Sequence, residues 1–134
     1  MLQNRSMPAS TVIPVLAYPS VPEAVAWLTA AFGLTLRLGI GDHRAQLNAG
    51  DGAIVITGAA AGEPRGVDSI MVRVEDARAH CDRAAAHGAT IAMPPTDFPY
   101  GERQYTAIDF SGRAWTFSET IADVDPREWG GVLR

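Results

Sequence analysis

Cysteine is nearly absent from this 134-residue sequence, in which Cys81 is the single example. One thiol forms neither an internal disulfide nor a zinc cluster of the CxxC type, so a metal would need histidine and carboxylate ligands. Basic residues are also few, since eleven Lys and Arg stand against fifteen Asp and Glu and leave a net charge of −4. Such a chain has no basic surface to neutralise a row of phosphates, so we expect no nucleic-acid partner.

Long apolar runs are missing as well. No stretch approaches the ~18 apolar residues that cross a membrane. The first ten residues carry an arginine but lack the apolar run of a secretory signal, so we expect a cytoplasmic protein without a membrane partner. The overall content, 47% hydrophobic and 19% charged, is typical of one globular domain and excludes wholesale disorder.

The first half of the chain begins with a predicted strand over residues 12–18. A helix follows at once, because Ser20 and Glu23 have the spacing of a capping box and Gly33 is placed to end the helix. Three more strands are then expected at 34–40, 43–49 and 53–58.

The second half repeats this order. A strand at 69–74 precedes a helix that starts at Asp76 and stops at Gly88. Further strands are expected at 89–95, 103–109 and 114–119. The two helix starts lie 56 positions apart and the two helix ends 55 apart, so the halves are nearly in register.

The sequence therefore predicts an α+β fold of duplicated βαβββ modules, whose cupped mixed sheets form a cleft. The expected parts of this single domain are module 1 at about 11–58, a linker at about 59–67, module 2 at about 68–121 and a C-terminal tail at 122–134. The tail is expected to pin itself through Trp129.

Period-2 alternation assigns the two faces of each sheet. In the strand at 69–74 the aliphatic residues face the helix, which leaves Met71 and Arg73 on the concave face. The same rule places Arg44, Gln46 and Thr116 on concave faces. It assigns Trp115 and Phe117 to the core, where the helical cysteine is also expected as a small apolar residue.

Residues 95–105 read as a loop rich in proline and aromatic side chains. It supplies Phe98, Tyr100 and Tyr105 beside Gln104, a combination that suits a cavity rim where flat rings stack. The other interpretation, in which the first two aromatic residues simply cover the core, stays open at this point.

Two segments carry a resemblance to a known family. PPTDFPYGERQYTAIDFSGRAWTFSE is similar to the closing pattern of the vicinal oxygen chelate superfamily, and SVPEAVAWLTAAFGL is similar to its first helix. That superfamily groups glyoxalase I, extradiol dioxygenases and bleomycin-resistance proteins. The resemblance runs from about Val12 to Glu119 and implies the duplicated fold predicted above.

The resemblance also implies a single divalent metal in the enzymes of the superfamily, which chelates adjacent oxygens of the substrate. The matching positions here are Ile13, Gln46, Ser69 and Thr116, of which only the glutamine is a possible ligand. Zinc or iron(II) needs at least three histidine or carboxylate donors. We therefore expect no metal and no cofactor. His80 and His87 are expected to face solvent on their helix.

What the resemblance implies is a metal-independent binding protein, in which ligands such as bleomycin or mitomycin are held away from their targets. We expect it to be a homodimer that sequesters an aromatic antibiotic or secondary metabolite, for resistance or self-resistance. The alternative is a glyoxalase-like, metal-dependent lyase or dioxygenase. The expected ligand-binding residues are Arg44, Gln46, Met71, Arg73, Phe98, Tyr100, Gln104, Tyr105 and Thr116.

Overall fold

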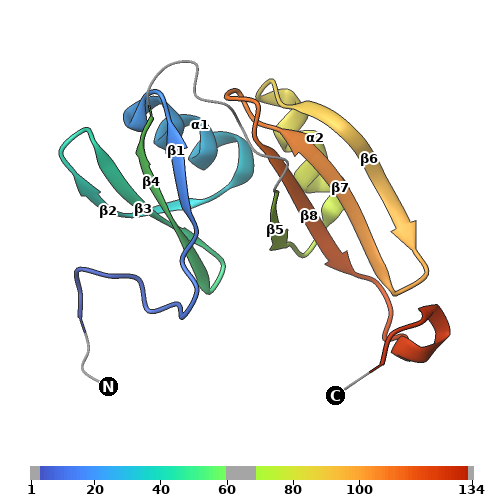
Figure 1. Ribbon diagram of the computed structural model, residues 1–134. Coiled ribbons are helices and arrows are strands. Elements are labelled where there is room, and N and C mark those ends of the chain that lie inside the picture. Colours follow the sequence, from blue (N-terminus) through green and yellow to red (C-terminus); the bar gives the residue numbers. More distant parts are fainter. Residues whose placement is uncertain (1–3, 60–68, 133–134) are drawn as a thin grey trace. The chain divides into compact units, whose positions relative to one another are not determined.

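The computed structural model describes residues 4–59 and 69–132 (Figure 1). The chain divides into two units, residues 1–64 and residues 65–134. Each unit holds one four-stranded mixed sheet and one α-helix, so the predicted α+β fold is confirmed. The expected linker, apart from residue 59, lies outside the described residues. Within the described ranges no helix has the length and hydropathy needed to cross a membrane.

Unit 1 has the expected βαβββ order. Its elements are β1 (Val15–Tyr18), α1 (Val21–Phe32), β2 (Thr35–Ile40), β3 (Arg44–Ala49) and β4 (Gly52–Gly58). The strands are arranged β1-β4-β3-β2, with β1 parallel to β4 and the other pairs antiparallel. The first strand starts at Val15, three residues later than residue 12, where the prediction begins it.

The predicted ends of helix α1 are confirmed. The Ser20 hydroxyl accepts a hydrogen bond from the Glu23 N–H at 3.3 Å, which satisfies a free donor of the first turn. At the other end Gly33 has a φ of 73°, the left-handed conformation that glycine adopts without strain. The helix buries Leu28 and Phe32 against the sheet. Trp27 is half-buried and packs edge-on to Phe32 with ring centroids 5.0 Å apart.

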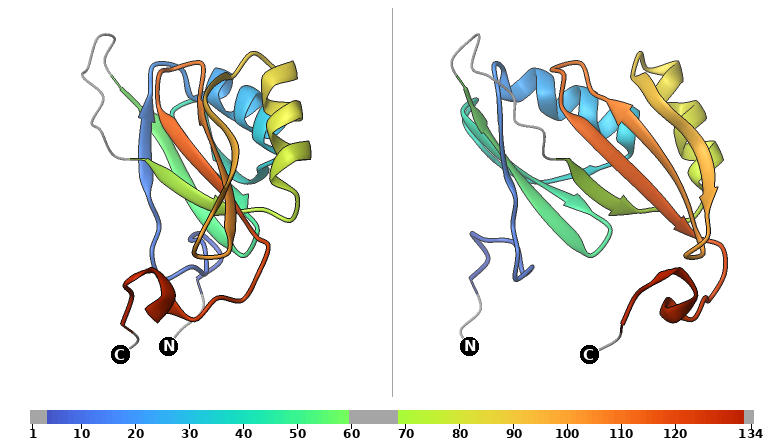
Figure 2. Two further views of the ribbon diagram at one scale, coloured as in Figure 1. Left: turned by 90° about the vertical axis from the view of Figure 1, so that its right-hand side faces the viewer. Right: turned by 45° about the vertical axis from the view of Figure 1, so that its right-hand side comes forward.

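Unit 2 repeats the order and adds a short 3-10 helix. Its elements are β5 (Ile70–Arg73), α2 (Ala77–Ala86), β6 (Thr90–Phe98), β7 (Glu102–Ile108), β8 (Ala114–Thr120) and η1 (Pro126–Trp129). The strand order β5-β8-β7-β6 is that of unit 1, and β5 is parallel to β8. Figure 2 shows α2 covering one face of this sheet.

The segment expected as a loop at 95–105 is instead a hairpin. Strand β6 continues to Phe98, a turn closes with the Gly101 N–H donating to the Phe98 carbonyl at 3.1 Å, and β7 begins at Glu102. Pro94 and Pro95 are tolerated because β6 is an edge strand and its pairing with β7 shifts register there. Proline therefore marks an irregular edge rather than the end of the strand.

The core of unit 2 lies between the sheet and α2. Trp115 and Phe117 are fully buried, and Cys81 from the helix is buried, as the alternation predicts. The Trp115 ring N–H donates to Asp109 Oδ2 at 3.0 Å, which supplies the partner that a buried indole needs. The burial that this core imposes on one face determines which side chains remain on the other face.

Candidate functional site

The sheet of unit 2 presents a polar face on the side opposite to α2. Strand pairing sets Met71 beside Thr116 and Arg73 beside Ser118, whereas the aliphatic residues of β5 pair with core residues. The predicted placement of Met71, Arg73 and Thr116 on the sheet face away from the helix is therefore confirmed. We call this surface the polar face; its members are Met71, Arg73, Phe98, Glu102, Gln104, Thr106, Thr116, Ser118 and Thr120.

A chain of hydrogen bonds crosses the polar face. Gln104 Nε2 donates to Ser118 Oγ at 3.0 Å, and Ser118 Oγ donates to Glu102 Oε1 at 2.7 Å. Thr106 and Thr116 share a further bond of 3.0 Å between their hydroxyls. Gln104 and Ser118 are nearly inaccessible, so these bonds fix the side chains in place. The face is therefore pre-organised rather than a set of free polar groups.

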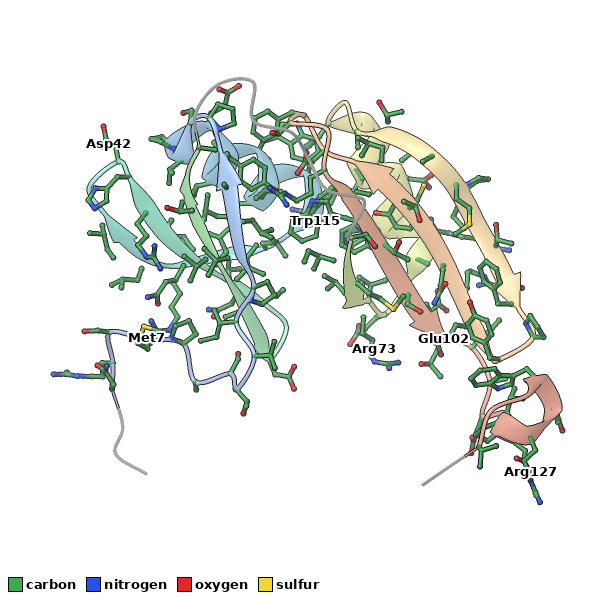
Figure 3. The ribbon with its side chains drawn as sticks, in the orientation of Figure 1. Met7, Asp42, Arg73, Glu102, Trp115 and Arg127 are labelled. Carbon is green, nitrogen blue, oxygen red and sulfur yellow. The ribbon has the colours of Figure 1, made fainter. Side chains whose placement is uncertain are left out.

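Arg73 and Glu102 supply opposite charges at one end of this chain (Figure 3). Arg73 Nη1 lies 3.8 Å from Glu102 Oε1 and donates to the Thr120 hydroxyl. The arginine side chain is 73% exposed and that of Glu102 only 19%. Burial raises the pKa of Glu102, but hydrogen bonds from Ser118 and Thr120 and the charge of Arg73 bring it below its usual value. The guanidinium thus has a fixed partner and still presents N–H groups to a ligand.

Aromatic rings lie at the hairpin end of the polar face. Phe98 and Tyr100 are stacked with centroids 5.4 Å apart and an interplanar angle of 12°, and Trp129 lies 5.4 Å from Tyr100. We call these three residues the aromatic cluster. Phe98 pairs with Glu102 in the ladder, so it lies on the polar face and does not cover the core beneath α2. The Tyr100 hydroxyl donates to Gln104 Oε1 at 3.3 Å, which connects the cluster to the hydrogen-bond chain.

The C-terminal tail is fixed beside this hairpin. The carbonyl of Gly101 accepts from the Ile121 N–H at 2.9 Å. Gly101 has a φ of 84°, and a Cβ at this position would collide with the carbonyl oxygen of Ala122. A glycine in the turn therefore lets the tail approach, and the expected pinning by Trp129 is seen in its contact with Tyr100.

Tyr105 is not at a rim, so its predicted placement is wrong. It is fully buried, its ring stacks on Phe117 at 5.2 Å, and its hydroxyl is hydrogen-bonded to His80 Nδ1. Consecutive strand residues point to opposite faces, so Tyr105 and Gln104 cannot share one. Burial raises the pKa of Tyr105 well above its usual value. His80, expected in solvent, lies with its ring 4.2 Å from Phe117, whereas His87 is exposed.

In unit 1 the predicted Gln46 is on the sheet face away from α1 but is only 3% exposed. Its amide donates to the Ser6 carbonyl at 2.8 Å, and its Oε1 accepts from Arg37 Nη1. Arg44 lies two residues away on the same strand face and is half-buried. The chain's own N-terminal segment therefore covers this glutamine.

Arg37 is a site residue that the alternation rule did not find. A β-bulge lies between Leu36 and Leu38 where β2 pairs with β3. Bulges re-aim side chains, and this one turns both Arg37 and Leu38 toward the face that holds Gln46. Among the other residues missed, Glu102 lies in what was interpreted as loop and Trp129 lies in the tail.

The donor set does not fit a divalent metal. Among residues 4–59 and 69–132, no three His, Cys, Asp or Glu side chains are grouped closely enough to hold one. The amide oxygen of Gln46 is bonded to the Arg37 cation, and Glu102 lies beside the Arg73 cation. A cation next to each oxygen donor opposes a metal ion at both places.

A separate hollow lies at the tail, where Asp125, Pro126, Arg127 and Val132 line it. Arg127 Nη2 and Asp125 Oδ2 are 2.6 Å apart, and the arginine side chain is 83% exposed and that of the aspartate 41%. These charges already neutralise each other, and none of the described residues that line the hollow is aromatic. The polar face with its aromatic cluster is the stronger candidate.

Comparisons with known proteins are consistent with the fold. Residues 11–117 match the Glyoxalase/Bleomycin resistance protein/Dioxygenase superfamily. The solved structure of TioX from Micromonospora sp. ML1 is 34% identical, covers 84% of this chain and 99% of its own, and gives a TM-score of 0.70. No curated protein matches the sequence.

Two further solved structures share the fold at lower identity. A glyoxalase/bleomycin resistance protein/dioxygenase from Nocardioides is 18% identical, with 93% of this chain and 89% of that one covered and a TM-score of 0.69. The fosfomycin resistance protein FosX from Listeria monocytogenes is 15% identical, with 84% and 95% covered and a TM-score of 0.69.

Proposed function

The chain belongs to the glyoxalase/bleomycin resistance protein/dioxygenase superfamily, and from this premise we propose that it binds a planar aromatic small molecule without a metal. The ligand is an antibiotic or secondary metabolite, and binding keeps it from its target. The observation that carries the proposal is the aromatic cluster joined by hydrogen bonds to the polar face of unit 2.

The aromatic cluster and the polar face contribute different interactions to ligand binding. The stacked rings of Phe98 and Tyr100 offer a flat apolar surface for a planar ring, and such aromatic pairs contribute about 0.5–1.5 kcal/mol beyond buried area. The exposed guanidinium of Arg73 offers N–H donors to carbonyl, phenolate or carboxylate oxygens of the ligand. Met71, 62% exposed on the same face, supplies an adaptable apolar contact.

Pre-organisation supports binding at this surface. Gln104 and Ser118 are already hydrogen-bonded in the free protein, so binding does not have to order them. On the polar face Ser118 donates its hydroxyl hydrogen to Glu102, whose pKa lies below its usual value, so this carboxylate is a weak base for activating a nucleophile. These features support retention of a ligand rather than its conversion.

The experiment is titration calorimetry of the full chain with bleomycin and with mitomycin C, and with fosfomycin as a small comparison compound that has no ring to stack. We expect at least one of the first two to bind and fosfomycin to bind at least about tenfold more weakly. Tyr100→Leu should weaken the binding about tenfold, whereas Arg127→Ala, at the separate tail hollow, should leave it unchanged. Equal affinities in Tyr100→Leu and the unaltered chain would contradict the proposal.

Metal content separates this proposal from the metal-dependent alternative. Protein purified without chelator should hold less than about a tenth of an equivalent of zinc, iron, nickel or manganese. Close to one equivalent would overturn the metal-independent function. Assays on substrates with adjacent oxygens would then test a lyase or dioxygenase.

A further inference from the structure

The N-terminal segment, residues 4–8, lies against the sheet face of unit 1 that is opposite to α1 (Figure 3, Met7). Gln46 Nε2 donates to the Ser6 carbonyl at 2.8 Å, and Arg37 Nη2 donates to the Arg5 carbonyl at 3.0 Å. Pro8 is buried. Two side chains from neighbouring strands therefore hold two consecutive carbonyls of one peptide.

The segment has a defined local shape. The Asn4 side chain accepts from the Ser6 N–H at 3.0 Å, and the Asn4 carbonyl accepts from the Met7 N–H at 3.2 Å. This turn leaves the carbonyls of residues 5 and 6 free of local partners in the segment, so they are directed to the sheet. The structure thus shows a short peptide bound through its backbone.

The Arg37 and Gln46 side chains are held in place by each other, independently of the N-terminal segment. Arg37 Nη1 also donates to Gln46 Oε1, which orients the glutamine so that its amide N–H groups face the segment. The bulge in β2 holds the arginine on this face. Because the contacts are made to backbone oxygens, they require consecutive amide carbonyls and not particular side chains at residues 5 and 6.

We propose that the Arg37–Gln46 pair is a binding site for peptide-like molecules, which the N-terminal segment occupies in cis. A ligand with consecutive amide carbonyls displaces the segment and takes over the two hydrogen-bond donors. This inference goes beyond the function proposed for unit 2, because it uses other residues and recognises backbone amide groups instead of flat aromatic rings. The two are tested by separate variants.

The covalent link between the N-terminal segment and unit 1 determines how strongly the segment competes with a free ligand. A short flexible tether gives the segment an effective concentration of about 1 mM at its own site. A free peptide with a dissociation constant of about 100 μM for the vacant site therefore binds the intact chain about tenfold more weakly. The segment acts as a competitor that raises the concentration of ligand needed.

Trypsin tests whether the segment is docked. The enzyme cleaves after Arg5, and the carbonyl of the scissile bond is the one that Arg37 holds. Cleavage of the Arg5–Ser6 bond in the full chain, followed by mass spectrometry, should be at least about tenfold slower than in a free peptide of residues 1–10. Pro8→Asp, which would place a charge in a buried position, and Gln46→Leu should each restore a rate close to that of the free peptide.

Three outcomes of this assay would overturn the proposal. The first is equal cleavage of the full chain and the free peptide. The second is a Pro8→Asp chain cleaved as slowly as the unaltered one. The third is protection that disappears on about hundredfold dilution, because the segment would then belong to a partner copy and not to its own chain.

Competition tests the site itself. The probe is a fluorescein-labelled, amidated peptide of residues 2–9, and its binding is followed by fluorescence anisotropy. It should bind the full-length Pro8→Asp chain about tenfold more tightly than the unaltered chain, and the double variant Pro8→Asp/Gln46→Leu should not bind it. Equal affinity for the unaltered and Pro8→Asp chains, or no binding to Pro8→Asp, would overturn the site. An unchanged melting temperature in each variant shows that the fold is intact.

Discussion

Tyr100 donates its hydroxyl hydrogen to Gln104 Oε1 at 3.3 Å, and this bond joins a stack of rings to a buried chain of hydrogen bonds. Gln104 in turn donates to Ser118 Oγ, and Ser118 Oγ donates to the Glu102 carboxylate, where the chain of hydrogen bonds ends. If the Tyr100 ring moves to accommodate a ligand, the hydrogen bonds between the polar groups of the neighbouring strands therefore change with it. The aromatic cluster and the Arg73–Glu102 charges lie next to each other at the hairpin end of the face, because Phe98 pairs with Glu102, so a planar ligand there can contact both.

Arg73→Ala is expected to weaken ligand binding about tenfold with almost no loss of stability. The side chain is 73% exposed, and exposed ion pairs contribute at most about 1 kcal/mol. Calorimetry with the antibiotic that binds, together with the melting temperature, measures both effects. Arg78→Ala, an exposed arginine on α2, is the matched control and should change neither. A fall in melting temperature as large as that of a core truncation would refute the assigned role.

Trp115→Ala is expected to destabilise the protein by about 3 kcal/mol or more, because it leaves a cavity in the core and removes one of the hydrogen-bond donors to Asp109. Urea unfolding measures this change. Trp129→Ala, at a ring that is 48% exposed, should change stability far less and should instead weaken binding at the aromatic cluster. Equal destabilisation by the two substitutions would contradict the face assignment of β8.

Tyr105→Phe is expected to cost about 1 kcal/mol at neutral pH, since it removes the hydrogen bond to His80 and leaves the ring in place. Burial raises the pKa of Tyr105, so the folded state resists ionisation that the unfolded chain undergoes near its usual value of 10.0. The stability that this tyrosine contributes is present below pH 10 and is lost as the pH rises above it.

The measurement for that prediction is urea unfolding of both chains between pH 8 and about pH 11. The unaltered protein should lose stability faster than Tyr105→Phe above pH 10. Parallel curves over the whole range would contradict the raised pKa. Ligand binding at pH 7 should be the same in both chains, because Tyr105 faces α2 and not the polar face.

A homodimer remains our proposal for the assembly. Strand β5 is an edge of its sheet and presents Met71, 62% exposed, and edge strands with exposed apolar side chains favour coverage by another surface. Sedimentation velocity at micromolar concentration should give about twice the 14.2 kDa mass of the chain. A species with the mass of one chain would contradict the proposal.

The fold followed from the sequence because its signals are local. Ser20, Asp76 and Gly33 mark helix ends by the chemistry of capping, and the structure shows each cap where it was predicted. Alternation likewise placed Arg73 and Gln46 on the correct sheet faces, since burying one face leaves no choice for the other.

The parts of the site that the sequence did not reveal depend on less local features. The two prolines of β6 led to the prediction of a loop where the structure has a strand. Tyr105 was therefore grouped with Gln104, although consecutive residues of a strand point to opposite faces of the sheet. The β-bulge beside Arg37 and the contact of Trp129 with Tyr100 arise from strand pairing and from the path of the tail, neither of which a periodic pattern encodes.

Glu102→Gln tests the charged end of the polar face through pH. The pKa of Glu102 lies below its usual value, despite burial, because Ser118, Thr120 and the Arg73 cation favour the carboxylate. A group with a lowered folded pKa contributes stability above its unfolded pKa, here 4.5, and loses that contribution as the pH falls through the folded value. We therefore expect the unaltered chain to be more stable than Glu102→Gln at pH 7.

Urea unfolding of both chains from pH 7 down to about pH 3 provides the measurement. Their difference in free energy of unfolding should shrink once the pH drops below 4.5 and should approach a constant small value at the acid end. Glu128→Gln, an exposed carboxylate in η1, is the matched control and should follow the unaltered chain throughout. A difference between Glu102→Gln and the unaltered chain that grows toward acid pH would show that burial, rather than the hydrogen bonds and Arg73, dominates at this carboxyl group.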